Sequence, residues 1–218
     1  MRGISPMKPV FSCALPLVAL GFVSLVSPPL SAADPTKYKV LDSLHRADDK
    51  SLKAGGGGSK LKAVSTSDSA HPKVLEFTAD FRDPSGWAGF TKTFPEGSVS
   101  AKKHTGFRFF VRGESGTRFN INVTYPNRRS DMKSRAFQGA GWTVSDKWTE
   151  VVVPFSSLKR HEVKEWKDGK QLFIPGGDAP EDEEINDFTT FSWSVHVSQR
   201  GSSVNSHMQL DDLSLILK

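Results

Sequence analysis

Residues 117–125, TRFNINVTY, show the clearest strand pattern in this sequence. From Arg118 onward, apolar and polar side chains alternate, which places each kind on one face of an extended chain. The apolar members are Phe119, Ile121, Val123 and Tyr125, and the polar members are Arg118, Asn120, Asn122 and Thr124. The segment therefore predicts a β-strand with one buried face and one polar face.

Several other segments have a similar period of two. They are residues 38–44, 72–81, 106–113, 148–155 and 188–198, and Gly, Pro, Asn and Asp mark the gaps between them. Only residues 157–166, SLKRHEVKEW, have a pattern that would suit a helical turn. Many short strands with few helices predict an all-β chain, folded as an antiparallel β-sandwich of the jelly-roll type.

The N-terminal 33 residues have the organisation of a secretory signal peptide. Arg2 and Lys8 precede an apolar run, and Ser31 and Ala33 are small residues at the expected cleavage positions. The alternative is an uncleaved membrane anchor, but Pro16 and the modest apolar length favour cleavage. We therefore expect a secreted or periplasmic protein with no membrane association after cleavage.

Residues 34–218 then form one predicted domain, long enough for a substantial core. Cleavage removes the only cysteine, so the domain has no disulfide, and it leaves a net charge of about +3 once Arg2 and Lys8 are gone. This mild, scattered charge does not suggest nucleic-acid binding. The glycine-rich residues 55–59 are interpreted as a loop within the domain, with a flexible linker as the alternative.

Polar side chains on the predicted outer faces are candidates for ligand binding. Arg118, Asn120 and Asn122 project together from one strand, and Arg108 and His196 have the outward position on others. Trp142, after the small residues QGAG, is the first candidate for stacking against a sugar ring, with Trp87 second, and Tyr125 is a further aromatic candidate. The competing interpretation is a solvated sheet face.

The order of several segments resembles a known group of carbohydrate-binding modules with the galactose-binding-like jelly-roll fold. The segments are GFRFFVRGESGTRFNINV, DKWTEVVVPFSSLKR, INDFTTFSWSV and HMQLDDLSLIL. They are most similar to family 11 carbohydrate-binding modules and to complex I intermediate-associated protein 30 domains, over about residues 38–217. The resemblance implies a non-catalytic carbohydrate-binding protein.

The resemblance also implies a structural calcium ion between the first and last strands. Asp211 would be a ligand, with Asp42 on the first strand as a weaker partner, because calcium prefers oxygen ligands. This chain has Leu44-His45 where relatives often have Phe-Glu, so one acidic ligand is missing. The alternative is a β-bulge in which Asp211 accepts backbone N–H bonds and Asp212 faces solvent.

Two other classes of function remain as alternatives. A jelly-roll polysaccharide lyase would use Tyr125, His196 and Arg118, but the compact lyase motifs are missing from the sequence. The acidic run 178–188, DAPEDEEINDF, is interpreted as a solvated loop and not a glycosidase pair. A protein-interaction or assembly module would need an exposed apolar patch. We therefore expect a monomeric carbohydrate-binding protein that is not an enzyme.

Overall fold

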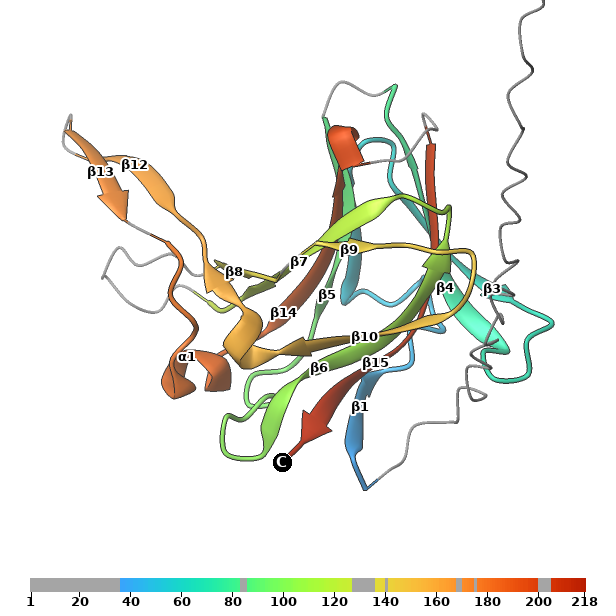
Figure 1. The fold of residues 1–218 in the computed structure, drawn as a ribbon, viewed down its shortest axis with the longest axis horizontal. Coiled ribbons are helices and arrows are strands. Elements are labelled where there is room, and N and C mark those ends of the chain that lie inside the picture. The colour runs from blue at the N-terminus through green and yellow to red at the C-terminus, as the bar shows by residue number, and fades with distance from the viewer. Residues whose placement is uncertain are drawn as a thin grey trace, which may run out of the picture. The chain divides into compact units, whose positions relative to one another are not determined.

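Two antiparallel sheets form the body of the protein in the computed structural model (Figure 1). The structure describes residues 36–82, 86–126, 136–139, 141–167, 170–174, 176–199 and 205–218. The predicted signal peptide, residues 1–33, lies outside them. Within the described part, no helix is long and apolar enough to cross a membrane.

The six-stranded sheet contains the first and last strands of the domain, between which the family resemblance implies a calcium ion. Its order is β10 (Thr149–Pro154), β6 (His104–Gly113), β15 (Asn205–Leu217), β4 (Lys73–Asp80) and β3 (Lys60–Ser65), and β1 (Tyr38–Asp42) also pairs with β15.

The seven-stranded sheet is the second layer. Its order is β11 (Lys159–Arg160), β8 (Ala136–Gln138), β7 (Arg118–Thr124), β14 (Thr190–His196), β5 (Trp87–Thr93) and β2 (Leu52–Gly56), and β9 (Trp142–Thr143) pairs with β7. A separate hairpin joins β12 (Val163–Lys167) and β13 (Lys170–Ile174).

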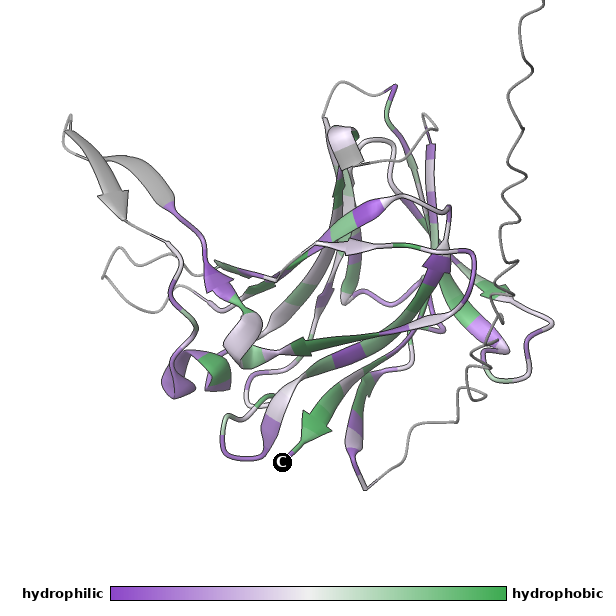
Figure 2. Ribbon diagram, viewed as in Figure 1, coloured by the Kyte–Doolittle hydropathy of each residue, from purple (hydrophilic) through white to green (hydrophobic). Residues whose placement is uncertain are grey.

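The alternating side chains take the positions that the sequence predicts. Phe119, Ile121 and Val123 of β7 are fully buried, while Asn120 and Asn122 are half-buried on the other face. Figure 2 shows hydrophobic residues on the strands of both sheets, interrupted by hydrophilic ones. The all-β jelly-roll sandwich predicted from this alternation is therefore confirmed.

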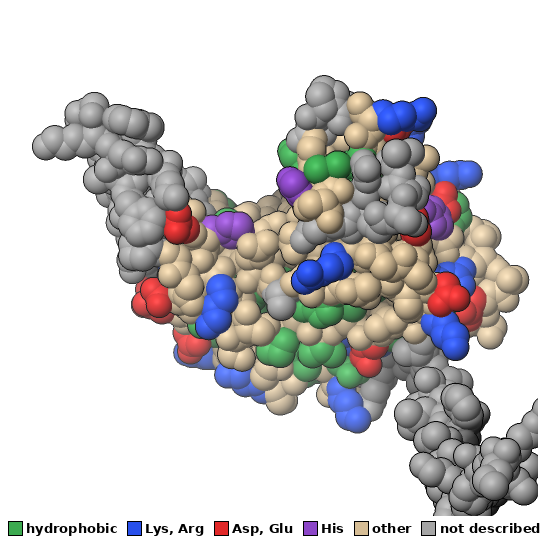
Figure 3. Space-filling model, turned by 45° about the horizontal axis from the view of Figure 1, so that its top comes forward, with side chains coloured by type: hydrophobic (Ala, Val, Ile, Leu, Met, Phe, Trp, Pro, Cys, Tyr) green, Lys and Arg blue, Asp and Glu red, His purple; other side chains and the backbone are tan. Residues whose placement is uncertain are grey.

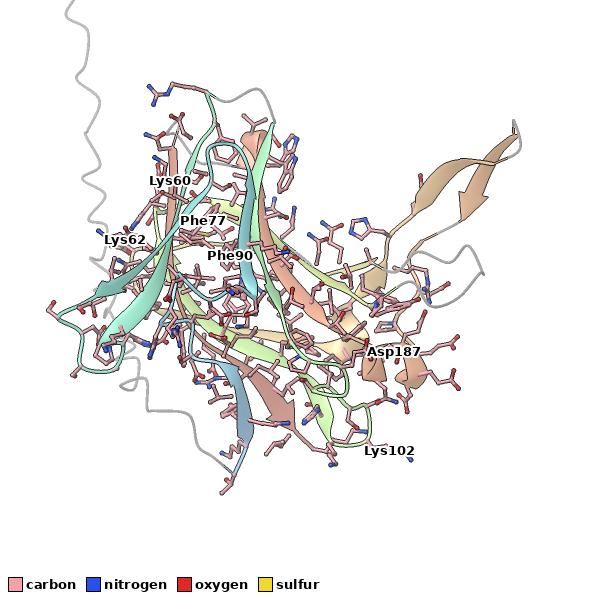
Figure 4. All side chains as sticks on the ribbon, turned by 180° about the vertical axis from the view of Figure 1, so that it is seen from behind. Lys60, Lys62, Phe77, Phe90, Lys102 and Asp187 are labelled. Carbon is pink, nitrogen blue, oxygen red and sulfur yellow. The ribbon has the colours of Figure 1, made fainter. Side chains whose placement is uncertain are left out.

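Aromatic side chains fill the space between the sheets. Phe77 of β4 and Phe90 of β5 point toward each other (Figure 4), with ring centroids 5.3 Å apart. Phe90 stacks in turn on Trp193 of β14, at 4.6 Å. Burying large rings in this way supplies most of the hydrophobic stabilisation of a domain without disulfides.

The glycine run carries the chain from one sheet to the other. Gly55 and Gly56 end β2 of the seven-stranded sheet, and β3 of the six-stranded sheet begins at Lys60. Gly56, Gly57 and Gly58 all have positive φ angles, a conformation that suits glycine. The run is thus a tight connection inside the domain.

Two local predictions are wrong. Residues 157–166 have a pattern that would suit a helical turn, but they contain the end of the 3₁₀ turn Phe155–Ser157, the strand β11 and the start of β12. The acidic run was expected to be a loop, but it contains the helix α1, Asp182–Asn186. Glu184 closes a capping box with Glu181 at the start of this helix and is buried against Arg160, which gives the acidic segment its structure.

Candidate functional site

A groove of about 660 Å³ lies over the seven-stranded sheet. Its floor consists of amide and hydroxyl side chains from four neighbouring strands, namely Thr91, Asn120, Asn122, Gln138, Ser192 and Ser194. Figure 3 shows the surface hollowed between two histidine side chains, coloured purple. His161 and His196 are the histidines that line the groove.

Hydrogen bonds between strands hold the floor in place. Thr91 and Ser192 share a hydroxyl–hydroxyl bond of 2.8 Å, and the amide of Asn122 donates to Ser194 Oγ at 3.3 Å. His161 Nε2 lies 3.0 Å from the oxygen of Asn122, an acceptor, so this nitrogen donates. The register places Asn122 opposite both Ser192 and Gln138, so the polar groups form one row across the sheet.

Trp87 provides an aromatic wall beside this row. Its side chain is 48% exposed although it is large and apolar. The indole ring lies directly over the end of β2, where a Cβ on Gly56 would come within 3.0 Å of the ring and 2.4 Å of the Trp87 carbonyl oxygen. The glycine run therefore makes room for Trp87 against the sheet.

Four of the sequence candidates meet in the groove. Trp87, Asn120, Asn122 and His196 line it together. Arg118 is exposed on the same face of β7, and a Cβ on Gly141 would lie 3.2 Å from Arg118 Nη2 and 3.1 Å from the Asn120 side-chain oxygen. Arg118 and Asn120 are thus close neighbours at one end of the groove.

Trp142 does not lie among the described lining residues. Its ring stacks on Phe119 with centroids 5.9 Å apart, and it packs against the hydrophobic core. A Cβ on Gly139 would come within 2.8 Å of the Trp142 ring. The small residues before Trp142 therefore allow it to fold onto the sheet, and Trp87 takes the exposed position that we expected for Trp142.

Arg108 corrects the expectation of an outward, accessible arginine. It is 2% exposed and belongs to β6 of the six-stranded sheet. Its guanidinium bonds to Glu150 at 2.5 Å and to Asp212 at 3.2 Å, and it lies over the rings of Tyr38 and Phe110. Alternation correctly predicts that Arg108 points away from the space between the sheets. It does not predict that β6 belongs to the six-stranded sheet, where Tyr38 and Phe110 cover this face.

Tyr125 also lies outside the described lining of the groove. Its hydroxyl donates to Glu184 at 3.0 Å, beside the 2.8 Å ion pair of Glu184 with Arg160. Burial raises the pKa of Tyr125, and the Glu184 carboxylate raises it further. The structure therefore does not bring Tyr125 together with His196 and Arg118, the set that the lyase alternative needs.

Lys53, Gln138 and His161 line the groove without having been predicted. Gln138 and His161 reach it because β8 pairs with β7 and β11 pairs with β8. These pairings involve very short strands, β8 of three residues and β11 of two. The alternation in residues 117–125 carries no signal for them.

The donors expected to bind calcium already have protein partners. Asp211 accepts from His45 Nε2 at 3.0 Å and from His71 Nδ1 at 2.7 Å, so both carboxylate oxygens are engaged. Asp42 forms an ion pair with Lys92 and accepts the Leu44 N–H at 2.6 Å. Calcium would have to displace these groups, and the described donor set as it stands does not fit the ion.

The Lys92 ammonium links the two sheets at this end of the sandwich. It projects from β5, is 6% exposed, and contacts Asp42 together with Asp49 at 2.8 Å and Ser51 at 2.5 Å. Burial acts to lower the pKa of Lys92, but Asp42 and Asp49 more than offset it, and the pKa is raised. Lys92 also holds the pKa of Asp49 well below its usual range.

The paired acids of β15 point to different partners because the strand has a bulge. The register with β6 shifts between Asp211 and Ser214, and Asp212 has a φ of 54°. Asp212 bonds to Arg108 and accepts from the Ser214 hydroxyl at 2.9 Å. The bulge that was the alternative to calcium is present, but imidazoles engage Asp211, and Asp212 is part of an ion pair.

No protein-family model matches this sequence, and no curated protein matches it. Solved structures do match its fold. A family 11 carbohydrate-binding module of a cellulosomal cellulase of Clostridium thermocellum aligns at 15% identity and a TM-score of 0.55, covering 86% of this chain and 97% of that one.

Two further structures show the range of proteins with this fold. A family 11 module from the same organism, in complex with a β-1,3-1,4-mixed-linked tetrasaccharide, aligns at 15% identity and a TM-score of 0.54, over 83% of this chain and 95% of that one. An exo-β-agarase aligns at 12% identity and a TM-score of 0.57, over 82% of this chain but 25% of the enzyme. The chain therefore has the fold of the family 11 carbohydrate-binding modules along most of its length.

Proposed function

We propose that this protein binds an oligo- or polysaccharide, without transforming it, in the groove over the seven-stranded sheet. The observation that carries the proposal is the exposed Trp87 beside a row of amide and hydroxyl groups. An indole can stack on the apolar face of a sugar ring while fixed polar groups bond to its hydroxyls. The fold shared with a module solved in complex with a tetrasaccharide supports carbohydrate as the ligand class.

The groove's own hydrogen bonds suit this task. Asn122 and Ser194 hold each other in position, and His161 fixes the amide of Asn122. A ligand therefore meets polar groups that are already oriented, which lowers the entropic cost of binding.

A glycan array followed by calorimetry tests the proposal. Trp87→Ala should weaken binding of any retained glycan by at least about tenfold, as is typical when a central aromatic contact is removed. Trp87→Phe should retain part of the affinity. Val152→Ala, at a 45% exposed apolar side chain on β10 of the other sheet, is the matched control and should bind normally. Retention of no glycan, or equal binding by Trp87→Ala, would reject the proposal.

We further propose that the protein is exported and acts as a monomer. The support is the signal-like composition of residues 1–33. Mass spectrometry of the protein from its native cells should find a mature chain that begins at Asp34, and light scattering should give the mass of one copy. An intact N-terminus on the native protein would contradict cleavage.

A further inference from the structure

The groove lies on a sheet whose ionisable side chains are all basic. The seven strands of this sheet, each described in full, have no Asp or Glu, and their ionisable residues are Lys53, Lys92, Arg118, Lys159, Arg160 and His196. The other sheet carries acids among its bases, namely Asp42, Glu76, Asp80, Glu150, Asp211 and Asp212. Acidic and basic groups are thus distributed differently between the two layers.

Two of the six basic groups are neutralised inside the protein. Lys92 is held by Asp42 and Asp49, and Arg160 is held by Glu184 at 2.8 Å. These two cations belong to the structure and do not contribute charge to the groove.

Lys53 and Arg118 are different. Both are exposed, and neither forms an ion pair with another described residue. Lys53 lines the groove from β2, and Arg118 lies beside Asn120 on β7, with β5 and β14 between these two strands. The groove therefore has one cation, Lys53, in its lining and a second, Arg118, next to it at one end.

The histidines add to this pattern. His161 and His196 line the groove from opposite parts of the sheet, and all the ionisable residues among the described lining are basic. Glu162 is exposed next to His161 in the chain but is not among those lining residues. An anionic ligand would meet the Lys53 ammonium and no carboxylate among the described lining residues.

We propose that the groove prefers polysaccharides that carry anionic groups, either the carboxylate of a uronic acid or a sulfate ester, over neutral ones. This inference rests on the proposed function and names the ligand class of the same groove. Trp87 and the amide row bind the sugar rings, and Lys53 and Arg118 recognise the anionic substituents. Single exposed charges interact weakly, so the preference depends on one extended ligand reaching both cations.

Matched pairs of polymers test the preference in affinity electrophoresis. Polygalacturonate is compared with its fully methyl-esterified form, and a sulfated galactan with agarose. At about 20 mM salt the anionic member of at least one pair should bind about fivefold tighter or more, and the gap should close at about 0.5 M salt, where exposed charges are screened. The two pairs distinguish carboxylate from sulfate.

Charge-removing variants locate the effect. Lys53→Gln and Arg118→Gln should each lower affinity for the anionic polymer by about threefold, a larger loss than either causes for its neutral partner. Lys102→Gln is the control for net charge, because Lys102 is exposed in the turn before β6, away from the groove lining (Figure 4). It should leave both affinities unchanged.

The outcomes separate this inference from the function on which it rests. If neutral polymers bind as tightly as the anionic ones and Trp87→Ala weakens both, the anionic preference is wrong and the proposed sugar binding stands. If Lys102→Gln lowers affinity for the anionic polymer as much as the groove variants do, the attraction comes from the net charge of the protein, and the anionic preference of the groove is also wrong. Binding of no polymer of either kind would reject both proposals.

Discussion

At the scale of single residues, the position of Trp87 depends on neighbouring glycines, which have no side chain to displace it. Gly56 has a φ of 75°, and a Cβ there would approach both the backbone and the ring of Trp87. The exposed ring at the groove is the contact on which the proposed sugar binding depends. The position of Trp87 is thus linked to the glycine run.

Gly56→Ala should therefore lower both stability and sugar affinity. The left-handed conformation alone costs an alanine about 1–2 kcal/mol, and the clash with Trp87 adds to this. Gly97→Ala is the matched control, because Gly97 has a φ of 74° and no atom lies within 4 Å of the place that an alanine Cβ would take. Urea unfolding and calorimetry should show a stability loss in both variants but an affinity loss only in Gly56→Ala. Normal affinity in Gly56→Ala would contradict the link.

His104 is a buried histidine that makes stability depend on pH. It is 3% exposed, its Nδ1 accepts the Ser100 N–H at 3.0 Å, and burial lowers its pKa, helped by Lys39 and Lys103. The unfolded chain therefore binds a proton near the ordinary histidine pKa of about 6.5, while the folded chain binds it only at lower pH. Stability should fall as the pH decreases through this window.

His104→Asn tests this assignment, because the asparagine oxygen can accept the same N–H but does not titrate there. Urea midpoints at about pH 7.5 and pH 5.5 should differ less in His104→Asn than in the wild type. His196→Asn, at an exposed histidine, should keep the wild-type difference. An unchanged difference in His104→Asn would assign the pH dependence to other groups.

At the scale of elements, ion pairs and hydrogen bonds connect segments that the strand pattern leaves separate. Lys92 of β5 reaches Asp42 of β1 across the two sheets, and Asp211 of β15 meets His45 and His71 from the segments after β1 and before β4. The bulge in β15 allows Asp211 and Asp212 to face different partners. These contacts join the first, middle and last parts of the chain.

Removing the Lys92 ammonium should be strongly destabilising. Lys92→Met keeps the length of the side chain but leaves Asp42 and Asp49 without their cation, which we expect to cost about 3 kcal/mol. Lys62→Met, at an exposed lysine of β3, should change stability by less than about 0.5 kcal/mol. Chemical unfolding measures both. An equally small effect of Lys92→Met would show that the Lys92 cluster contributes little.

At the scale of the whole molecule, alternation predicted the layers but not the completed groove. The buried face of β7 and the polar row of Asn120 and Asn122 follow directly from the sequence. Arg108 has the same kind of pattern, yet Tyr38, Phe110 and Asp212 cover it. His161 and Gln138 join the site through the pairing of short strands. A period of two reports on faces of a strand and not on what packs against them.

The whole fold should also be insensitive to chelation, because Lys92 engages Asp42 and the imidazoles of His45 and His71 engage Asp211, the two acids expected to bind calcium. Thermal melts with excess EDTA and with millimolar calcium should have the same midpoint, since a ligand stabilises only a fold that binds it. A rise of the midpoint by several degrees in calcium would instead support the metal site implied by the family resemblance.

The accessibility of Trp87 gives the molecule an internal optical reporter. Trp193 is 1% exposed, whereas Trp87 is 48% exposed at the groove. Collisional quenchers such as acrylamide should therefore reach the indole of Trp87 far more readily than that of Trp193. A sugar stacked on Trp87 would shield it, so titrating a glycan under quencher would turn groove occupancy into a change in fluorescence without any added label.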